Sequence, residues 1–175
     1  MPWGKVVKFC DFGPNGTFLY AGGSKTGIVI VPFDLLKDTV STIDYSTDGL
    51  EAIRIYNGYL YVVSKPLNSF DPVKIYRHQI NSDGSIGSQE EVFDMNSLND
   101  SSEVTGLAFS ESGKMFIAEN SADIFYKGII HPNCVNIYWG LNDYLCMING
   151  NTTTGETWNA YRLIRDLKAH HIINN

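Results

Sequence analysis

The chain has 175 residues, of which 43% are hydrophobic and 13% aromatic, and this composition excludes a disordered protein because enough apolar surface can be buried to offset ordering entropy. The net charge is −6 with only 13 Lys and Arg residues, which argues against a nucleic-acid partner. No run approaches about 18 apolar residues, so no transmembrane helix is expected, and the start Met-Pro-Trp-Gly-Lys lacks the apolar core of a signal peptide.

The first predicted unit begins with a hairpin. Residues 6–12 and 17–21 are strand-like runs separated by Gly13-Pro14-Asn15-Gly16, a connection in which glycine supplies the left-handed backbone conformation. Residues 28–33 and 40–45 then read as a third and a fourth strand. Together they predict a four-stranded antiparallel sheet.

The second unit has the clearest turn in the chain. Residues 52–56 and 59–63 flank Asn57-Gly58, and a two-residue type I′ turn needs positive φ at both central residues, which Asn and Gly tolerate. Two further alternating runs, 73–77 and 89–93, complete a second predicted four-stranded sheet.

The third and fourth units are less complete. Residues 105–109 and 114–118 flank Ser110-Glu111-Ser112-Gly113, and 123–127 read as a third strand. The last predicted strands are 135–139 and 144–148, which form a hairpin around 140–143, and 157–164. This fourth unit is short of one strand.

The turns place Gly16, Gly58 and Gly113 at matching points, each followed by an aromatic–aliphatic pair. A recurrence of about 50 residues is near the period of propeller blades. We therefore predict an all-β, β-propeller-like fold with about four blades of four-stranded antiparallel sheet, complete or incomplete, in one domain spanning 1–175. The alternative is a generic antiparallel meander. The predicted blades are 5–46, 50–96, 103–132 and 133–165, with a tail at 166–175.

Two of the repeats resemble a known family pattern. Residues 12–22 (FGPNGTFLYAG) and 109–119 (FSESGKMFIAE) are similar to the F-S-P-D-G-K-x-L-Y-V-A pattern of YVTN-type and gluconolactonase-type β-propellers. The resemblance covers roughly residues 5–130 and implies a fold rather than a function, because propellers host many unrelated activities.

The gluconolactonase-type resemblance also implies a metal site. In those enzymes an acidic ligand lies near the start of a blade, the position of Glu51 and Glu103 here, with Asn and Asp supplied by other blades. The set Glu103, Asn120, Asn142 and Asp143 could then surround Ca²⁺, which accepts carboxylate and amide oxygens. The alternative is that these residues cap turns, and no cofactor is needed.

Aromatic residues give the best binding signal. Tyr and Trp combine a large apolar area with a polar tip, which favours them at interfaces. The predicted binding residues are Trp139, Tyr144, Trp158 and Tyr161. Packing between blades is the competing explanation, and a protein surface or a glycan would suit such a group.

The remaining candidates have ordinary explanations. His78, like the other histidines, is predicted to be a surface residue. Glu90 and Glu91 resemble paired acid–base carboxylates, but charges on an edge strand explain them better. The cysteines are Cys10, Cys134 and Cys146, and their spacing is not that of metal ligands. Two alternatives remain: the cysteines are buried free thiols, or Cys134 and Cys146 form a disulfide bridge.

The leading functional hypothesis is a non-enzymatic binding or structural assembly module, for example a component of a phage or virus tail or another surface structure. It would use loops and channel surfaces, bind protein partners or copies of itself, and be cytoplasmic or virion-associated. The alternatives are a metal-dependent lactonase-like hydrolase and a carbohydrate-binding lectin.

Overall fold

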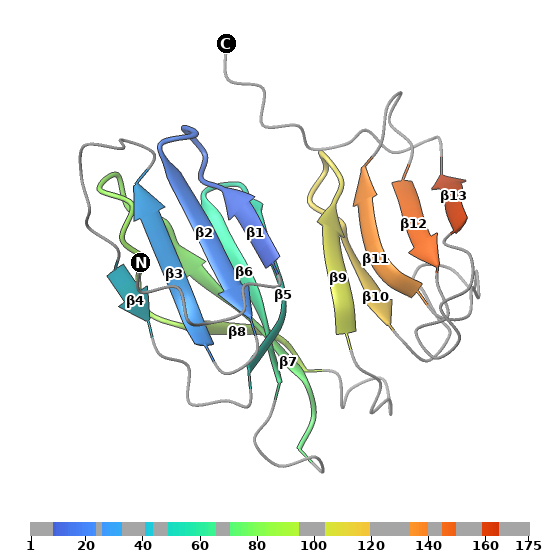
Figure 1. Ribbon diagram of the computed structural model, residues 1–175, viewed down its shortest axis with the longest axis horizontal. Coiled ribbons are helices and arrows are strands. Elements are labelled where there is room, and N and C mark those ends of the chain that lie inside the picture. Colours follow the sequence, from blue (N-terminus) through green and yellow to red (C-terminus); the bar gives the residue numbers. More distant parts are fainter. Residues whose placement is uncertain are drawn as a thin grey trace. The chain divides into compact units, whose positions relative to one another are not determined.

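The computed structural model describes residues 9–23, 26–32, 41–43, 49–65, 71–94, 104–119, 134–139, 145–149 and 159–164. Every element in this part of the chain is a β-strand, so the all-β prediction is confirmed. The strands are β1 (Phe9–Phe12), β2 (Phe18–Gly23), β3 (Thr26–Pro32), β4 (Ser41–Ile43), β5 (Gly49–Tyr56), β6 (Tyr59–Lys65), β7 (Lys74–Gln79), β8 (Glu90–Asp94), β9 (Val104–Phe109), β10 (Met115–Glu119), β11 (Cys134–Trp139), β12 (Leu145–Asn149) and β13 (Asn159–Ile164). The chain divides into two compact units, residues 1–101 with 174–175, and residues 102–173, and each is considered by itself (Figure 1).

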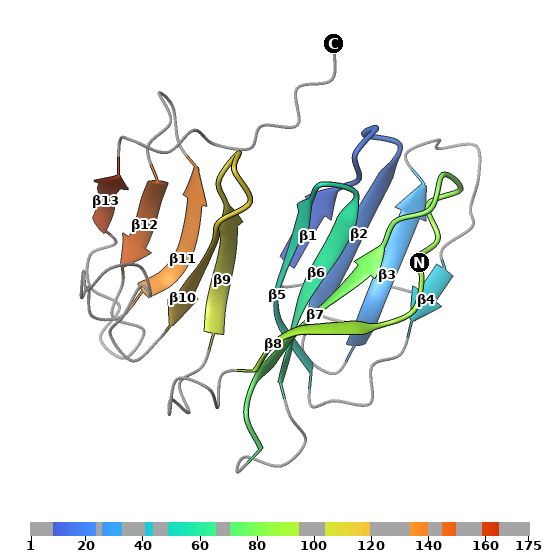
Figure 2. The same ribbon diagram turned by 180° about the vertical axis from the view of Figure 1, so that it is seen from behind.

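The first unit holds two four-stranded antiparallel sheets, each an up-and-down meander. The first has the order β1-β2-β3-β4 and the second β5-β6-β7-β8, in agreement with the two predicted sheets. Figure 2 shows both sheets from behind. Asn57 and Gly58 have φ values of 48° and 76° between the paired residues Tyr56 and Tyr59. This is the type I′ turn that the sequence predicted.

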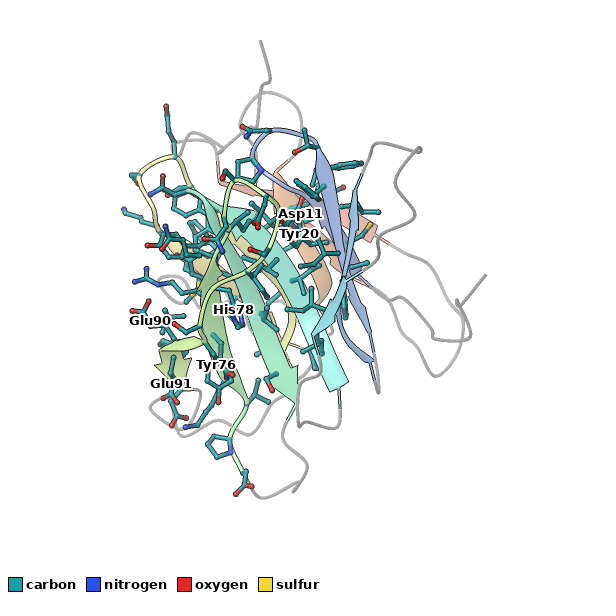
Figure 3. All side chains as sticks on the ribbon, turned by 90° about the vertical axis from the view of Figure 1, so that its left-hand side faces the viewer. Asp11, Tyr20, Tyr76, His78, Glu90 and Glu91 are labelled. Carbon is teal, nitrogen blue, oxygen red and sulfur yellow. The ribbon has the colours of Figure 1, made fainter. Side chains whose placement is uncertain are left out.

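The two sheets of this unit pack face to face on an apolar core. Figure 3 shows side chains filling the layer between them. One face of the first sheet supplies the fully buried Tyr20 and Ile28, and the second sheet supplies Leu50 and Leu60, also fully buried. Fully burying a side chain of this size contributes about 1.5–3 kcal/mol, so the unit is held together mainly by this layer.

Close backbone approach tightens the same interface. A Cβ added at Gly22 would lie 2.8 Å from Leu50 Cδ1, so the Leu50 side chain would have to shift to make room. Gly22 therefore lets the second strand of one sheet come within contact distance of the first strand of the other. Glycine matters here for the space it leaves to Leu50 and not for its backbone conformation, because φ at Gly22 is not positive.

The second unit contains the hairpin β9–β10 and the sheet β11-β12-β13. In the hairpin, the amide of Ser110 donates to Lys114 O at 3.0 Å and the amide of Gly113 to Ser110 O at 3.0 Å, with Gly113 at φ 84°. The turn predicted at 110–113 is confirmed. The strand predicted at 123–127 lies outside the described residues.

The β11–β12 register bears on the cysteine alternatives. Cys134 is paired with Asn149, whereas Cys146 is paired with Tyr138. Three residues along a strand span about 10 Å, and bridged cysteines need Cα atoms within about 7 Å. The register therefore argues against the Cys134–Cys146 bridge.

Cys10 is free but exposed, so the prediction of a buried thiol is wrong for this residue.

Candidate functional site

The candidate site lies where two hairpin turns of the first unit meet. One turn joins β1 to β2, with the amide of Gly13 donating to Phe18 O at 2.8 Å and Gly16 at φ 64°. The other follows β7: the amide of Asn81 donates to Ser85 O at 2.9 Å and the amide of Gly84 to Asn81 O at 3.0 Å. The two turns come from different sheets, so packing of the sheets brings them together.

Tyr20 connects the two turns through a hydrogen bond. Its side chain is fully buried, and its hydroxyl donates to Gly84 O at 2.8 Å. Burial, together with the nearby negative charge of Asp83, raises the pKa of Tyr20 to about 12. The phenol therefore stays protonated, and the hydrogen bond persists, throughout the physiological pH range.

Gly84 is required for two reasons. Its φ is 83°, a conformation that L side chains rarely adopt. A Cβ at this position would also lie 2.5 Å from the ring of Phe18. The Phe18 ring and the Tyr20 hydroxyl thus hold the same glycine, one by contact and one by hydrogen bonding.

The 81–85 turn is also braced internally. Asp83 Oδ1 accepts hydrogen bonds from the Ser85 hydroxyl at 2.6 Å and the Ser85 amide at 3.0 Å, and these bonds lower the pKa of Asp83. Asn81 Nδ2 donates to Ser85 Oγ at 2.9 Å. This turn was not predicted from the sequence, although Asn-Ser-Asp-Gly is a strong turn signal.

A cavity of about 200 Å³ lies between the turns, and we call it the hairpin-end cavity. Its apolar lining comes from Pro14, Phe18, Tyr20 and Ile80. Its polar lining includes Asn15, Thr17, Asn81 and Ser82. None of the described residues of this lining is charged, so they offer aromatic contact and neutral hydrogen-bonding groups.

Asp11 connects the first strands of the two sheets beside this site, and it is labelled with Tyr20 in Figure 3. Its Oδ2 accepts a hydrogen bond from the Ile55 amide at 2.8 Å and lies 3.7 Å from Arg54 Nη1, while Oδ1 accepts from the Phe12 amide at 3.0 Å. Burial raises the pKa of Asp11, and these hydrogen bonds and the Arg54 charge oppose the shift. Asp11 was not predicted as a site residue.

The paired carboxylates on β8 act as ion-pair partners of β7. Glu90 holds the Arg77 guanidinium at 2.8 and 2.9 Å, and Glu91 accepts from Lys74 Nζ at 2.8 Å. Arg77 also lies 4.7 Å from the Tyr59 ring centroid, a cation–π distance. The charged-edge interpretation of Glu90 and Glu91 therefore fits the structure, and both are exposed on a strand at the end of the sheet.

His78 was predicted to be a surface residue, and this prediction is wrong. Its exposed fraction is 4%, and Nδ1 lies 2.9 Å from Gly87 O. Because a carbonyl can only accept, Nδ1 carries the proton and donates it. Burial lowers the pKa of His78, which favours the neutral ring.

The residues predicted from sequence as a metal site are not placed by the structure. Glu103, Asn120, Asn142 and Asp143 all lie outside the described residues. Within the part that is described, no group of three His, Cys, Asp or Glu residues could hold a metal ion. Glu51 is buried and lies at the irregularity between Leu50 and Ala52 on β5.

The predicted aromatic binding group is placed only in part. Trp139 ends β11 and Tyr161 lies on β13, which fixes their backbone positions. Tyr144 and Trp158 lie outside the described residues. The structure therefore leaves this group as a prediction.

In the described part of the chain there is no helix of the length and hydrophobicity that crossing a bilayer requires.

Comparison with known proteins supports the fold. The sequence matches no protein-family model and no curated protein. Among solved structures, the chain is similar to the β-propeller domain of Myceliophteria thermophila Cps50 (Swd1), with a TM-score of 0.56 and 14% sequence identity. The match covers 91% of this chain and 54% of that domain, so the chain spans about half its length. The propeller-like fold class is confirmed, while the YVTN or gluconolactonase repeat type remains a prediction.

Proposed function

We propose that this chain is a non-catalytic protein-interaction module, and that its hairpin-end cavity receives one side chain of a protein partner. Similarity to a propeller domain supports an interaction or assembly role in general. The observation that carries the specific proposal is the cavity itself, built from two turns of different sheets and lined by neutral groups.

The volume of the cavity selects the class of ligand. Sites for drug-sized molecules and cofactors typically measure about 300–1,000 Å³, and this cavity measures about 200 Å³. That space suits a single large side chain. Protein interfaces commonly depend on such an anchor residue seated in a pocket.

The lining and the rigidity of the turns favour the same use. Phe18 and Tyr20 present aromatic surface, and Asn81 and Ser82 offer donors and acceptors. The Tyr20–Gly84 hydrogen bond fixes the position of one turn against the other before any ligand arrives. A preorganised pocket loses little conformational entropy on binding. An uncharged aromatic or aliphatic anchor fits these features best.

The proposal can be tested without knowing the partner. We expect N-acetyl amino-acid methylamides with Phe, Tyr, Leu or Met side chains to shift amide resonances of Gly13, Thr17, Asn81 and Ser82 in ¹⁵N-labelled protein. A single side chain should bind with a dissociation constant on the order of millimolar. Asp and Lys derivatives should give no saturable shift, because the described lining residues carry no charge to pair with them.

A matched pair of variants separates filling of the cavity from general surface change. Ser82→Trp places a large ring in the cavity lining and should abolish the shifts. Glu111→Trp makes the same change at the corresponding position of the 110–114 turn, which has the same hydrogen-bond pattern, and should leave the shifts intact. Equal loss in both variants, or no saturable shift in the parent protein, would refute the proposal.

A further inference from the structure

We infer that Asn57 is a site of spontaneous covalent modification, at which the side-chain amide is lost and the main chain is rerouted through an isoaspartyl linkage. The chemistry needs an asparagine followed by a glycine whose amide nitrogen is accessible. Asn-Gly occurs at 57–58, 15–16 and 149–150, and Gly150 lies outside the described residues. Whatever the hairpin-end cavity binds, the reaction at Asn57 depends on its own turn alone.

The reaction needs water and no enzyme. The Gly58 amide nitrogen loses its proton to hydroxide and attacks Cγ of Asn57, so that an N–Cγ bond forms. The Cγ–Nδ2 bond breaks, and the nitrogen leaves as ammonia after taking a proton from water. The succinimide ring then takes up one water: opening at one carbonyl gives aspartate in an unchanged backbone, and opening at the other gives isoaspartate, whose main chain is one carbon longer.

The surroundings of Asn57 and Gly58 leave room for this attack. Asn57 is exposed, and a Cβ added at Gly58 would meet no heavy atom within 4 Å beyond its chain neighbours. Within the described part of the chain, neither the Asn57 carboxamide nor the Gly58 amide takes part in a hydrogen bond. The two reacting groups can therefore meet, once the turn opens, without losing a hydrogen bond of their own.

The Asn15–Gly16 pair differs at the attacking nitrogen. Asn15 is also exposed, but the Gly16 amide donates a hydrogen bond to Gly13 O at 2.9 Å. The same turn is closed by a hydrogen bond from the Gly13 amide to Phe18 O at 2.8 Å. A hydrogen bond that must break before the attack slows the reaction about two- to tenfold. We therefore expect Asn57 to react before Asn15.

Isoaspartate at this position should disturb more than the turn itself. A type I′ turn places two residues between the paired Tyr56 and Tyr59, and one additional main-chain carbon does not fit that geometry. The turn also presents the Gly58 carbonyl, which accepts a hydrogen bond from the Ile80 amide at 2.9 Å. A displaced carbonyl leaves the Ile80 amide without this acceptor, directly before the 81–85 turn.

Peptide mass spectrometry of the full chain, aged in mildly alkaline buffer over several weeks, tests the site. We expect the peptide that contains Asn57 to gain about 1 Da, because an amide becomes a carboxyl group, and to do so faster than the peptide that contains Asn15. Electron-transfer fragmentation should identify isoaspartate beside aspartate. Asn57→Gln should remove the gain, since a glutamine side chain would have to close a larger ring.

Amide hydrogen exchange tests the consequence. Aged protein that carries isoaspartate, separated by ion exchange, should exchange the Ile80 amide faster than fresh protein does. Freshly prepared Asn57→Asp has the new charge in a backbone of normal length, and Asp-Gly also fits a type I′ turn, so its Ile80 amide should exchange at the parent rate. An Asn57 peptide that keeps its mass, reacts no faster than the Asn15 peptide, or yields aspartate alone would overturn the inference.

Discussion

The 81–85 turn and the 110–114 turn have the same backbone and different surroundings. In each, the first amide bonds to the last carbonyl, and a glycine near φ 84° donates back to the first residue. Gly84 is buried beneath Phe18 and Tyr20, whereas Gly113 is exposed. The local sequence is therefore enough to form the turn. Packing against the other sheet makes the 81–85 turn, and not the 110–114 turn, part of a cavity.

Substituting the two glycines should give the largest difference. Gly84→Ala forces a methyl group into the Phe18 ring as well as straining the backbone, so we expect a loss of about 3 kcal/mol in unfolding free energy. Gly113→Ala carries the backbone strain, about 1 kcal/mol. Urea unfolding of both variants measures the contrast, and equal losses would show that the Phe18 contact contributes nothing.

Removing the hydroxyl that hydrogen-bonds to each of the two turns should have an intermediate effect on the unfolding free energy. Tyr20→Phe leaves the buried carbonyl of Gly84 without this donor, which should cost about 1–3 kcal/mol. Ser110→Ala removes the Oγ that accepts from the Lys114 amide, but this hydrogen bond is only partly buried, whereas the bond from Tyr20 to Gly84 is buried. We therefore expect a smaller loss for Ser110→Ala in the same urea experiment, and the reverse order would contradict this account.

Acidification should give the smallest effect. Burial lowers the pKa of His78 below its ordinary value of 6.5, so the unfolded chain takes up a proton before the folded one does. The contribution of His78 to the free energy of unfolding is therefore complete above pH 6.5, and it declines as the pH falls towards the pKa of His78 in the folded protein. Urea midpoints at pH 7.5 and 5.5 should show this decline. His78→Gln should reduce the slope, and an unchanged slope would assign it to other groups.

The sequence predicted the strands well because their signals are local. Asn57-Gly58 specifies a type I′ turn whatever surrounds it, and the alternating runs on either side pair as their pattern requires. The two four-stranded sheets and the 110–113 turn follow from the same kind of information. Each of these features depends on residues a few positions apart.

The site was missed because it depends on contacts between distant residues. Tyr20 and Gly84 are 64 positions apart, and Asp11 and Ile55 are 44 apart. His78 is paired with the fully buried Leu60 of β6. Directly paired residues share a face of the sheet, so the burial of the histidine depends on the neighbouring strand and on the first sheet that packs on this face, and its own residue type did not reveal it.

The Asp11 carboxylate also protects the protein from unwanted strand pairing. Tyr56 and Tyr59 are paired across their two-residue turn, so the neighbouring Ile55 amide points away from β6, towards the edge of the sheet, where no described strand pairs with β5. An unsatisfied row of such amides is a template for another chain, and ordered aggregation can begin there. Asp11 accepts the hydrogen bond from this amide, so an incoming strand would have to displace a half-buried carboxylate before it could add to the edge.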